Sequence, residues 1–144
     1  MTTVGQVLKE KGHAICSVAP GDTVFEALGV MAEFGIGALV VLEDRRLVGI
    51  FSERDYARKI ILQDKRSHDT YVREVMTTAL ICVGPTQMVD ECMHLMTEKR
   101  VRHLPVLEGE ELVGVVSIGD IVKAMMVEQK RLIEQLEGYI KSGG

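Results

Sequence analysis

The hydrophobic and polar positions of the chain predict the same series of elements twice. Apolar runs at 14–18 and 79–83 each stop just before a turn that contains a proline, which is typical of a strand that enters a turn. Apolar residues at helical spacing follow in 24–31 and again in 89–96. Each half of the chain is therefore predicted to begin with a strand and a helix.

A predicted hairpin follows each of these helices. The stretches "ALVVLEDRRLVGIF" (38–51) and "LPVLEGEELVGVV" (104–116) each predict two strands joined by a charged turn. A further helix is expected from about 53 to 62, and another from about 118 onward. The order of elements in each half is thus strand, helix, strand, strand, helix.

The two halves align without a gap when the chain is shifted by the 65 residues that separate Leu47 from Leu112. A match of this length indicates an internal duplication. We therefore predict an α/β (α+β) fold made of two βαββα repeats. Identical residues meet in the pairs Val18/Val83, Pro20/Pro85, Val24/Val89, Met31/Met96, Gly49/Gly114, Ser52/Ser117 and Asp55/Asp120.

The predicted boundaries follow from this alignment. Residues 1–66 hold the first repeat with an N-terminal segment, 67–124 hold the second repeat, and 125–144 form a C-terminal helical extension. A repeat of about 60 residues buries so little apolar surface that its stability alone would be marginal. We expect the two repeats to pack about a pseudo-twofold axis into one compact disc, with two three-stranded sheets facing each other.

Composition and charge exclude several classes of protein. A formal net charge of −4 and a pI near 5.6 provide no basic surface for nucleic acid. No apolar run reaches the roughly 18 residues that a membrane span requires, and the N-terminus lacks the apolar core of a secretory signal. The three cysteines, at 16, 82 and 92, form no CxxC pair. These features predict a cytoplasmic, reducing setting, without nucleic-acid or membrane partners.

The repeated serine and aspartate allow two interpretations that are compatible. Ser52 and Asp55, like Ser117 and Asp120, have the S-x-x-D spacing of a capping box at a helix start. Such a junction between a strand and a helix also offers unpaired backbone N–H groups to an anion. An aspartate there can accept hydrogen bonds from both hydroxyls of a ribose. The sequence alone leaves open whether the motif caps a helix, binds a ligand, or does both.

The duplicated G-h-h-S-x-x-D unit, the "RHLPV" strand and the "VREVMT" segment together resemble a tandem pair of cystathionine-β-synthase (CBS) domains, over about residues 4–124. The resemblance implies a Bateman module in its stand-alone form. It implies two clefts between the repeats that bind adenosine ligands such as AMP, ATP, NAD or S-adenosylmethionine. Binding in such modules usually regulates an enzyme or a transporter.

The resemblance also implies roles for individual residues. Asp55 and Asp120 are expected to bind ribose, with Ser52 and Ser117 near ribose or phosphate. The residues expected against the adenine come from the first strand of each repeat: Leu80, Ile81 and Cys82 in one cleft, and Ile15 and Cys16 in the other. The residues expected near phosphate are Val101, Arg102, His103 and Arg54.

The same carry-over predicts that the two clefts differ. In the first repeat, Ile36, Gly37 and Ala38 stand where the second has Val101, Arg102 and His103, and Gly119 stands where the first has Arg54. The Asp55 cleft is expected to draw on Arg54, Arg102 or His103 for phosphate. The Asp120 cleft, with Gly37 and Ala38 beside it, offers more space and suits a dinucleotide, although Arg102 could also turn toward it.

Several other signals are weaker. The four histidines lack metal-ligand spacing, so no metal is expected. The cysteines lie among apolar residues and are expected in the core, with redox sensing by Cys16 or Cys82 as the alternative. We find no catalytic carboxylate pair, nucleophile with a base, or phosphate loop, and therefore expect no enzyme. A nucleotide-processing enzyme and a ligand-independent scaffold remain as alternatives.

The C-terminal extension predicts self-association. Met125, Leu132, Leu136 and Ile140 recur at helical spacing, and the helix outruns what its own repeat can cover. We expect this apolar stripe to meet a second copy of the chain, which would make the protein a homodimer. Packing back along its own repeat is the alternative.

Overall fold

The computed structural model describes residues 1–143, and its contacts divide the chain into two compact units. The repeat-1 unit comprises Ala14–Ile81 together with Glu110–Leu112. The repeat-2 unit comprises Met1–His13, Cys82–Gly109 and the chain from Val113 onward. The repeat-2 unit is thus built from both ends of the chain.

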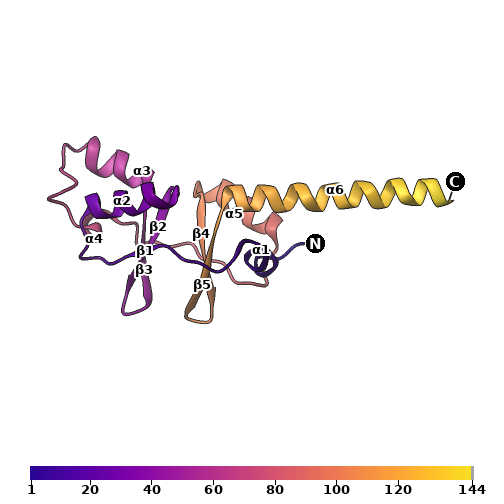
Figure 1. The fold of residues 1–144 in the computed structure, drawn as a ribbon, viewed down its shortest axis with the longest axis horizontal. Coiled ribbons are helices and arrows are strands. Elements are labelled where there is room, and N and C mark those ends of the chain that lie inside the picture. Colours follow the sequence, from indigo (N-terminus) through magenta and orange to yellow (C-terminus); the bar gives the residue numbers. More distant parts are fainter. Residues whose placement is uncertain (144) are drawn as a thin grey trace. The chain divides into compact units, whose positions relative to one another are not determined.

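The repeat-1 unit contains a three-stranded sheet with helices packed against it (Figure 1). Strands β1 and β2 pair in parallel, and β2 and β3 pair antiparallel, with a register shift between Val41 and Leu42. The elements of this unit are β1 (Ser17–Val18), α2 (Val24–Phe34), β2 (Ala38–Glu43), β3 (Arg46–Ser52), α3 (Glu53–Asp55), the π-helix η1 (Tyr56–Ile61) and α4 (Val72–Val75).

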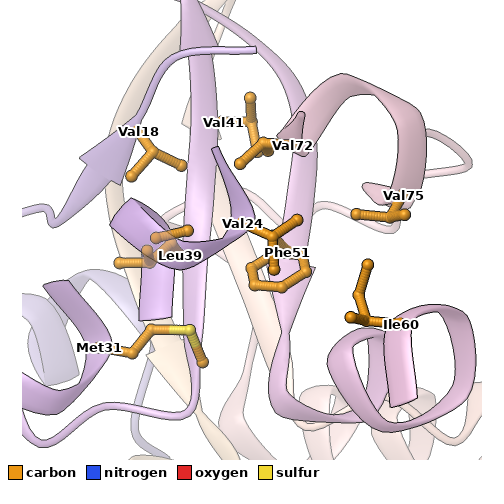
Figure 2. Close-up of a cluster of buried hydrophobic side chains, with 10 residues drawn as sticks. Val18, Val24, Met31, Leu39, Val41, Phe51, Ile60, Val72 and Val75 are labelled. Carbon is orange, nitrogen blue, oxygen red and sulfur yellow. The ribbon is translucent and has the colours of Figure 1, made fainter. Parts of the chain in front are cut away.

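The core of the repeat-1 unit gathers apolar side chains from all of these elements except α3 (Figure 2). Phe51 of β3 is fully buried among the aliphatic side chains that Figure 2 labels around it. Its ring is the largest side chain in the cluster, so it contributes the largest single share of the apolar area that holds the sheet to α2 and η1. The buried members are Val18, Val24, Ala27, Met31, Leu39, Val41, Phe51, Ile60, Val72 and Val75.

The repeat-2 unit has the same plan with a smaller sheet. Its elements are α1 (Val4–Lys11), α5 (Val89–Lys99), β4 (His103–Glu108), β5 (Glu111–Ser117) and α6 (Ile118–Gly143), and β4 pairs with β5. Helix α6 contacts α5 and α1 and then continues past them (Figure 1). The buried apolar residues here include Val4, Leu8, Val89, Cys92, Met96, Leu104, Val106, Val116 and Ile121.

The 65-residue alignment is confirmed for the helices and hairpins, because α5, β4 and β5 begin and end 65 residues after α2, β2 and β3. The first strand of each repeat was predicted too long. In the run 14–18 only Ser17 and Val18 pair, with Val40 and Val41. The run 79–83 forms no strand: Val83 makes an isolated parallel bridge to Val106.

The pairing of both first strands is short at its N-terminal side. The backbone N–H of Val83 donates to Pro105, and the N–H of Leu107 donates to Val83, and these two bonds make up the single bridge. A proline two residues after each of Val18 and Val83 limits only the C-terminal end of each run, whereas the residues that fail to form a ladder, 14–16 and 79–82, lie before the paired ones. The second sheet therefore has two strands, and the prediction of a third was wrong.

The helix predicted over 53–62 also differs from expectation. It begins as one turn, α3, and continues as the π-helix η1, in which the N–H of Leu62 donates to the carbonyl of Ala57 at 3.1 Å. The wider i→i+5 turn is rare and often occurs at functional sites. Here it contains Lys59, whose side chain reaches Asp55.

A short helix before each repeat packs against the repeat that does not follow it. The N–H of Val4, at the start of α1, donates to the carbonyl of Gln87 at 2.8 Å, within the repeat-2 unit. The N–H of Val72, at the start of α4, donates to the carbonyl of Asp22 at 2.8 Å, within the repeat-1 unit. These bonds fix α1 and α4 beside the hairpins that carry the two S-x-x-D motifs.

The repeated glycine of the motif makes this approach possible. A Cβ atom added to Gly49 would lie 3.1 Å from the carbonyl oxygen of Thr77, and one added to Gly114 would lie 2.7 Å from a methyl carbon of Leu8. Only a residue without a side chain fits there without a shift of α1 or of the segment after α4. The two glycines thus allow the segment after α4 and helix α1 to pack closely against their hairpins.

Candidate functional site

Both S-x-x-D motifs form the capping bonds that their spacing predicts. The N–H of Asp55 donates to Ser52 Oγ at 3.2 Å, and the N–H of Ser52 donates to Asp55 Oδ2 at 2.9 Å. The N–H of Asp120 donates to Ser117 Oγ at 3.2 Å, and the N–H of Ser117 donates to Asp120 Oδ2 at 2.8 Å. The capping interpretation is confirmed for both copies, at the starts of α3 and α6.

Asp55 is enclosed by hydrogen-bond donors. Its Oδ2 also accepts from the hydroxyl of Ser52 at 3.0 Å, and its Oδ1 accepts from Thr77 Oγ1 at 3.1 Å. The ammonium of Lys59 lies 3.0 Å from Oδ1 and donates also to the carbonyl of Val75. Asp55 is 6% exposed. Both of its carboxylate oxygens are therefore occupied, and little of the group faces solvent.

Asp120 is more open. The ammonium of Lys11 lies 2.5 Å from its Oδ2 and donates also to the carbonyl of Val115 at 2.8 Å. The side chain of Asp120 is 24% exposed. Burial raises the pKa of this carboxyl, but the hydrogen bonds from Lys11 and Ser117 and the positive charge of Lys11 outweigh burial, so the pKa lies below its ordinary value. Asp120 is thus held as a carboxylate.

The two aspartates are neutralised by lysines from unrelated positions. Lys59 lies four residues after Asp55 on the same helical segment, whereas Lys11 is 109 residues before Asp120 and belongs to α1. The i,i+4 spacing of Asp55 and Lys59 was readable from the sequence. Nothing in the sequence pairs Lys11 with Asp120, because the repeat alignment places neither lysine opposite the other.

The residues predicted near phosphate, and the uncharged residues that take their place in the first repeat (Ile36, Gly37 and Ala38), lie beside the motif of their own repeat. The N–H of Glu53 donates to the carbonyl of Gly37 at 3.0 Å, and Ala38 pairs with Ser52 across β2 and β3. In the repeat-2 unit, the N–H of Ile118 donates to the carbonyl of Arg102 at 2.8 Å. The remaining members of this set are Ile36, Val101 and His103, which are half-buried, and Arg54, which is exposed in α3.

The residues predicted against the adenine lie outside the strands. Ile15 and Cys16 precede β1 in the repeat-1 unit and are half-buried. Leu80 and Ile81 of the same unit and Cys82 of the repeat-2 unit are half-buried and extended between α4 and α5. Their assignment to strands was wrong, and their assignment to a ligand stays a prediction.

A cavity of about 750 Å³ adjoins Asp120 in the repeat-2 unit. It lies between α1 and α6, and a volume of this size is in the range of ligand pockets. Charged side chains of both signs line it, which suits a polar ligand better than an apolar one. Its lining includes Thr2, Gln6, Val7, Glu10, Lys11, Asp120, Lys123, Val127, Glu128 and Arg131.

Cysteines and metal ligands add nothing to this site. All three cysteines are unpaired; Cys92 is buried, and burial, with Glu91 and Asp90 nearby, raises its pKa to about 11. Burial also raises the pKa of Cys82. Within residues 1–143, no three His, Cys, Asp or Glu side chains lie close enough together to hold a metal ion. None of the helices in that range has the length and hydrophobicity to cross a membrane.

Comparisons with known proteins agree on one family. The model of the CBS domain matches residues 12–62 and 72–127. The chain is 40% identical to the CBS domain-containing protein CBSX3, mitochondrial, of Arabidopsis thaliana, over 99% of this chain and 73% of that protein. A solved structure of a protein with CBS domains from Burkholderia ambifaria MC40-6 is 50% identical, with a TM-score of 0.85 over 89% of this chain and 96% of that chain.

A more distant structure contains ligands. The CBS domain pair of protein MJ0100, in complex with 5-methylthioadenosine and S-adenosyl-L-methionine, superposes with a TM-score of 0.79 over 89% of this chain and 98% of that chain. Its sequence identity is 23%, so this likeness concerns the fold.

Proposed function

The chain belongs to the CBS-domain family, with two tandem copies of the domain, and we propose that it is a regulatory module that binds an adenosine nucleotide, AMP, ATP or NAD, at two unequal sites. Each site contains one S-x-x-D motif. Binding is proposed to change the activity of a partner enzyme or transporter. We place the module in the reducing cytoplasm, which the unpaired cysteines support.

Asp120 is the observation that carries this proposal. Its carboxylate is ionised, partly exposed, and fixed at the junction of β5 and α6 by the N–H of Ser117. It borders a cavity large enough for a nucleotide. A carboxylate in this position can accept the two hydroxyls of a ribose, and a family relative of the same fold binds adenosine compounds.

Asp55 supports the inequality of the two sites. A ribose that binds Asp55 has to displace Thr77 or Lys59, because both carboxylate oxygens are already bonded. Asp120 uses Oδ2 alone in its bonds to Lys11 and Ser117. We therefore expect the tighter binding event at Asp120 and a weaker one at Asp55.

The experiment is a calorimetric titration of AMP and of NAD into the parent chain and into Asp55→Ala and Asp120→Ala. Each variant is expected to lose a different binding event, with a fall in affinity of about tenfold or more for a lost charge-assisted contact. If both variants bind both ligands as the parent does, the aspartates are helix caps alone. If the parent shows neither heat nor a thermal shift, the scaffold alternative holds, and if product accumulates, the chain is an enzyme.

For the exposed end of α6 we propose a second copy of the chain as partner. Every residue from Gln129 to Lys141 is exposed, although this stretch carries several large apolar side chains. Met126, Ile133 and Ile140 are seven residues apart and are 64%, 50% and 69% exposed, and Leu136 continues the same stripe. A repeat of seven is the spacing by which two helices pack along a shared seam.

Sedimentation tests this assembly. The parent chain is expected to sediment as a dimer at micromolar concentration, and Ile133→Glu is expected to shift it to the monomer by placing a charge in the seam. Gln135→Glu, which adds the same charge on another face of α6, is the matched control. A monomeric parent, or equal behaviour of the two variants, would contradict the seam.

A further inference from the structure

Lys11 and Asp120 form an ion pair with bonding capacity left on both partners. An ammonium has three N–H donors, and Lys11 directs two of them to Asp120 Oδ2 and the carbonyl of Val115. Asp120 accepts the bonds from Lys11 and from the N–H of Ser117 on Oδ2, so Oδ1 takes part in neither of these. The pair therefore presents one further donor with positive charge and one further acceptor with negative charge, side by side.

The space beside this pair suits the anionic end of a ligand. The cavity between α1 and α6 is about 750 Å³ and has Lys123 and Arg131 on its α6 wall. Glu10 and Glu128 also line it, and Glu128 is engaged by the N-terminal ammonium of the chain at 3.3 Å. The lysines and the arginine thus place positive charge on the side of Asp120 where α1 faces α6.

The first repeat has a similar lysine but a different carboxylate. Lys59 bonds Asp55 and the carbonyl of Val75, and its side chain is 38% exposed, as is that of Lys11. Asp55, however, is also bonded by Ser52 and Thr77, and its side chain is 9% exposed against 24% for Asp120. What distinguishes the Asp120 site is thus the open carboxylate beside the lysine and the cavity that both residues line.

We propose that Lys11 makes the Asp120 site select anionic nucleotides over neutral nucleosides, with the anionic group of the ligand in the groove between α1 and α6. This inference rests on the proposed function, because it concerns the same site. The sequence motif does not contain Lys11, since α1 belongs to the other end of the chain. Lys11 thus determines which ligand charge the site prefers, in addition to the residues of the motif.

The selection follows from what each ligand does to the ion pair. A neutral ribose that binds Asp120 through both of its hydroxyls needs Oδ2 as well as the open Oδ1, so it competes with Lys11 for Oδ2 and offers the ammonium nothing in return. A nucleotide replaces the lost partner, because its phosphate oxygens accept a charge-assisted bond from Lys11 while its hydroxyls bind Asp120. The same lysine thus lowers affinity for the nucleoside and raises it for the nucleotide.

The experiment titrates adenosine and AMP separately into the parent, Lys11→Met and Lys11→Arg by calorimetry. In Lys11→Met, adenosine is expected to bind more tightly and AMP more weakly, each by about tenfold, the size of one charge-assisted bond. Lys11→Arg keeps the positive charge and is expected to keep the preference for AMP. Lys9→Met removes a charge from the same helix at an exposed position and is expected to change neither affinity.

The outcomes separate this inference from the function on which it rests. Opposite changes for the two ligands in Lys11→Met support it. Equal changes, or none, overturn it, and the proposed function then stands if Asp120→Ala still removes one of the binding events of AMP. A parent chain that binds neither adenosine nor AMP overturns both.

Discussion

The two S-x-x-D motifs are expected to contribute unequally to stability, although their sequences match. Asp55→Ala removes an acceptor of four bonds, from the N–H and hydroxyl of Ser52, from Thr77 and from Lys59. Asp120→Ala removes an acceptor of three, from the N–H and side chain of Ser117 and from Lys11, but this carboxylate is 24% exposed, so water replaces part of what is lost. Since bonds to a charged group contribute about 1.5 kcal/mol each and overlap within one network, we expect losses of about 3 and about 1.5 kcal/mol.

The deeper burial of Asp55 also predicts that Asp55→Ala destabilises the chain more than Asp120→Ala does. Asp55 is 6% exposed, so its removal leaves Thr77 and Lys59 with few water molecules to replace the carboxylate. For a chain of this size, 1 kcal/mol shifts Tm by about 3–4 °C, which predicts falls of about 10 °C for Asp55→Ala and about 5 °C for Asp120→Ala. Thermal unfolding followed by circular dichroism measures the two Tm values, and urea unfolding measures the two losses of free energy. An Asp120→Ala variant as unstable as Asp55→Ala would refute the reasoning.

Three further predictions concern other residues. Gly114→Ala is expected to destabilise the chain by about 1–3 kcal/mol in urea unfolding, because its Cβ would meet Leu8 at 2.7 Å; unchanged stability would mean that α1 shifts freely. The stability contributed by Asp120 is present above the unfolded pKa of 3.8 and is lost as pH falls toward the lower folded pKa, so the parent should exceed Asp120→Asn by more at pH ~6 than at pH ~3. Cys92, with its pKa raised to about 11, should react with iodoacetamide more slowly than Cys16 in the native chain, as measured by mass spectrometry; faster labelling of Cys92 would contradict its burial.

The sequence predicted those parts of the fold that depend on local pattern. The hairpin of β2 and β3 recurs 65 residues later because alternation of apolar and polar positions and a charged turn specify each copy independently. The capping bonds of Ser52 and Ser117 are equally local, since three residues suffice to form them. The short first strands were missed because a strand exists only where its partner pairs with it, and the apolar run around Cys82 says nothing about that partner.

The environment of the two aspartates was the part that the sequence could not supply. The motif is the same in both repeats, and the predicted difference between the clefts rested on Arg54, Arg102 and His103 and not on the aspartates. In the structure Asp55 is saturated and Asp120 is open. The difference comes from Thr77 and Lys11, which approach from segments outside the motif and, for Lys11, from the opposite end of the chain. Contacts over such separations depend on where α1 packs, and the periodicity of apolar residues in the sequence does not predict this.

The composition of the two units sets an order for folding during synthesis. Apart from Glu110–Leu112, the repeat-1 unit is one continuous stretch that ends at Ile81, so a growing chain has nearly all of it before the second repeat is made. Residues 1–13 cannot dock until the second repeat has been made. Lys11 can pair with Asp120 only after 109 further residues have been synthesised, which takes roughly 5–20 s at the usual rates of translation. Residues 1–13 leave the ribosome before either repeat and are yet among the last to be docked, so a nascent chain that stalls early exposes Val4, Val7 and Leu8 to chaperones and proteases.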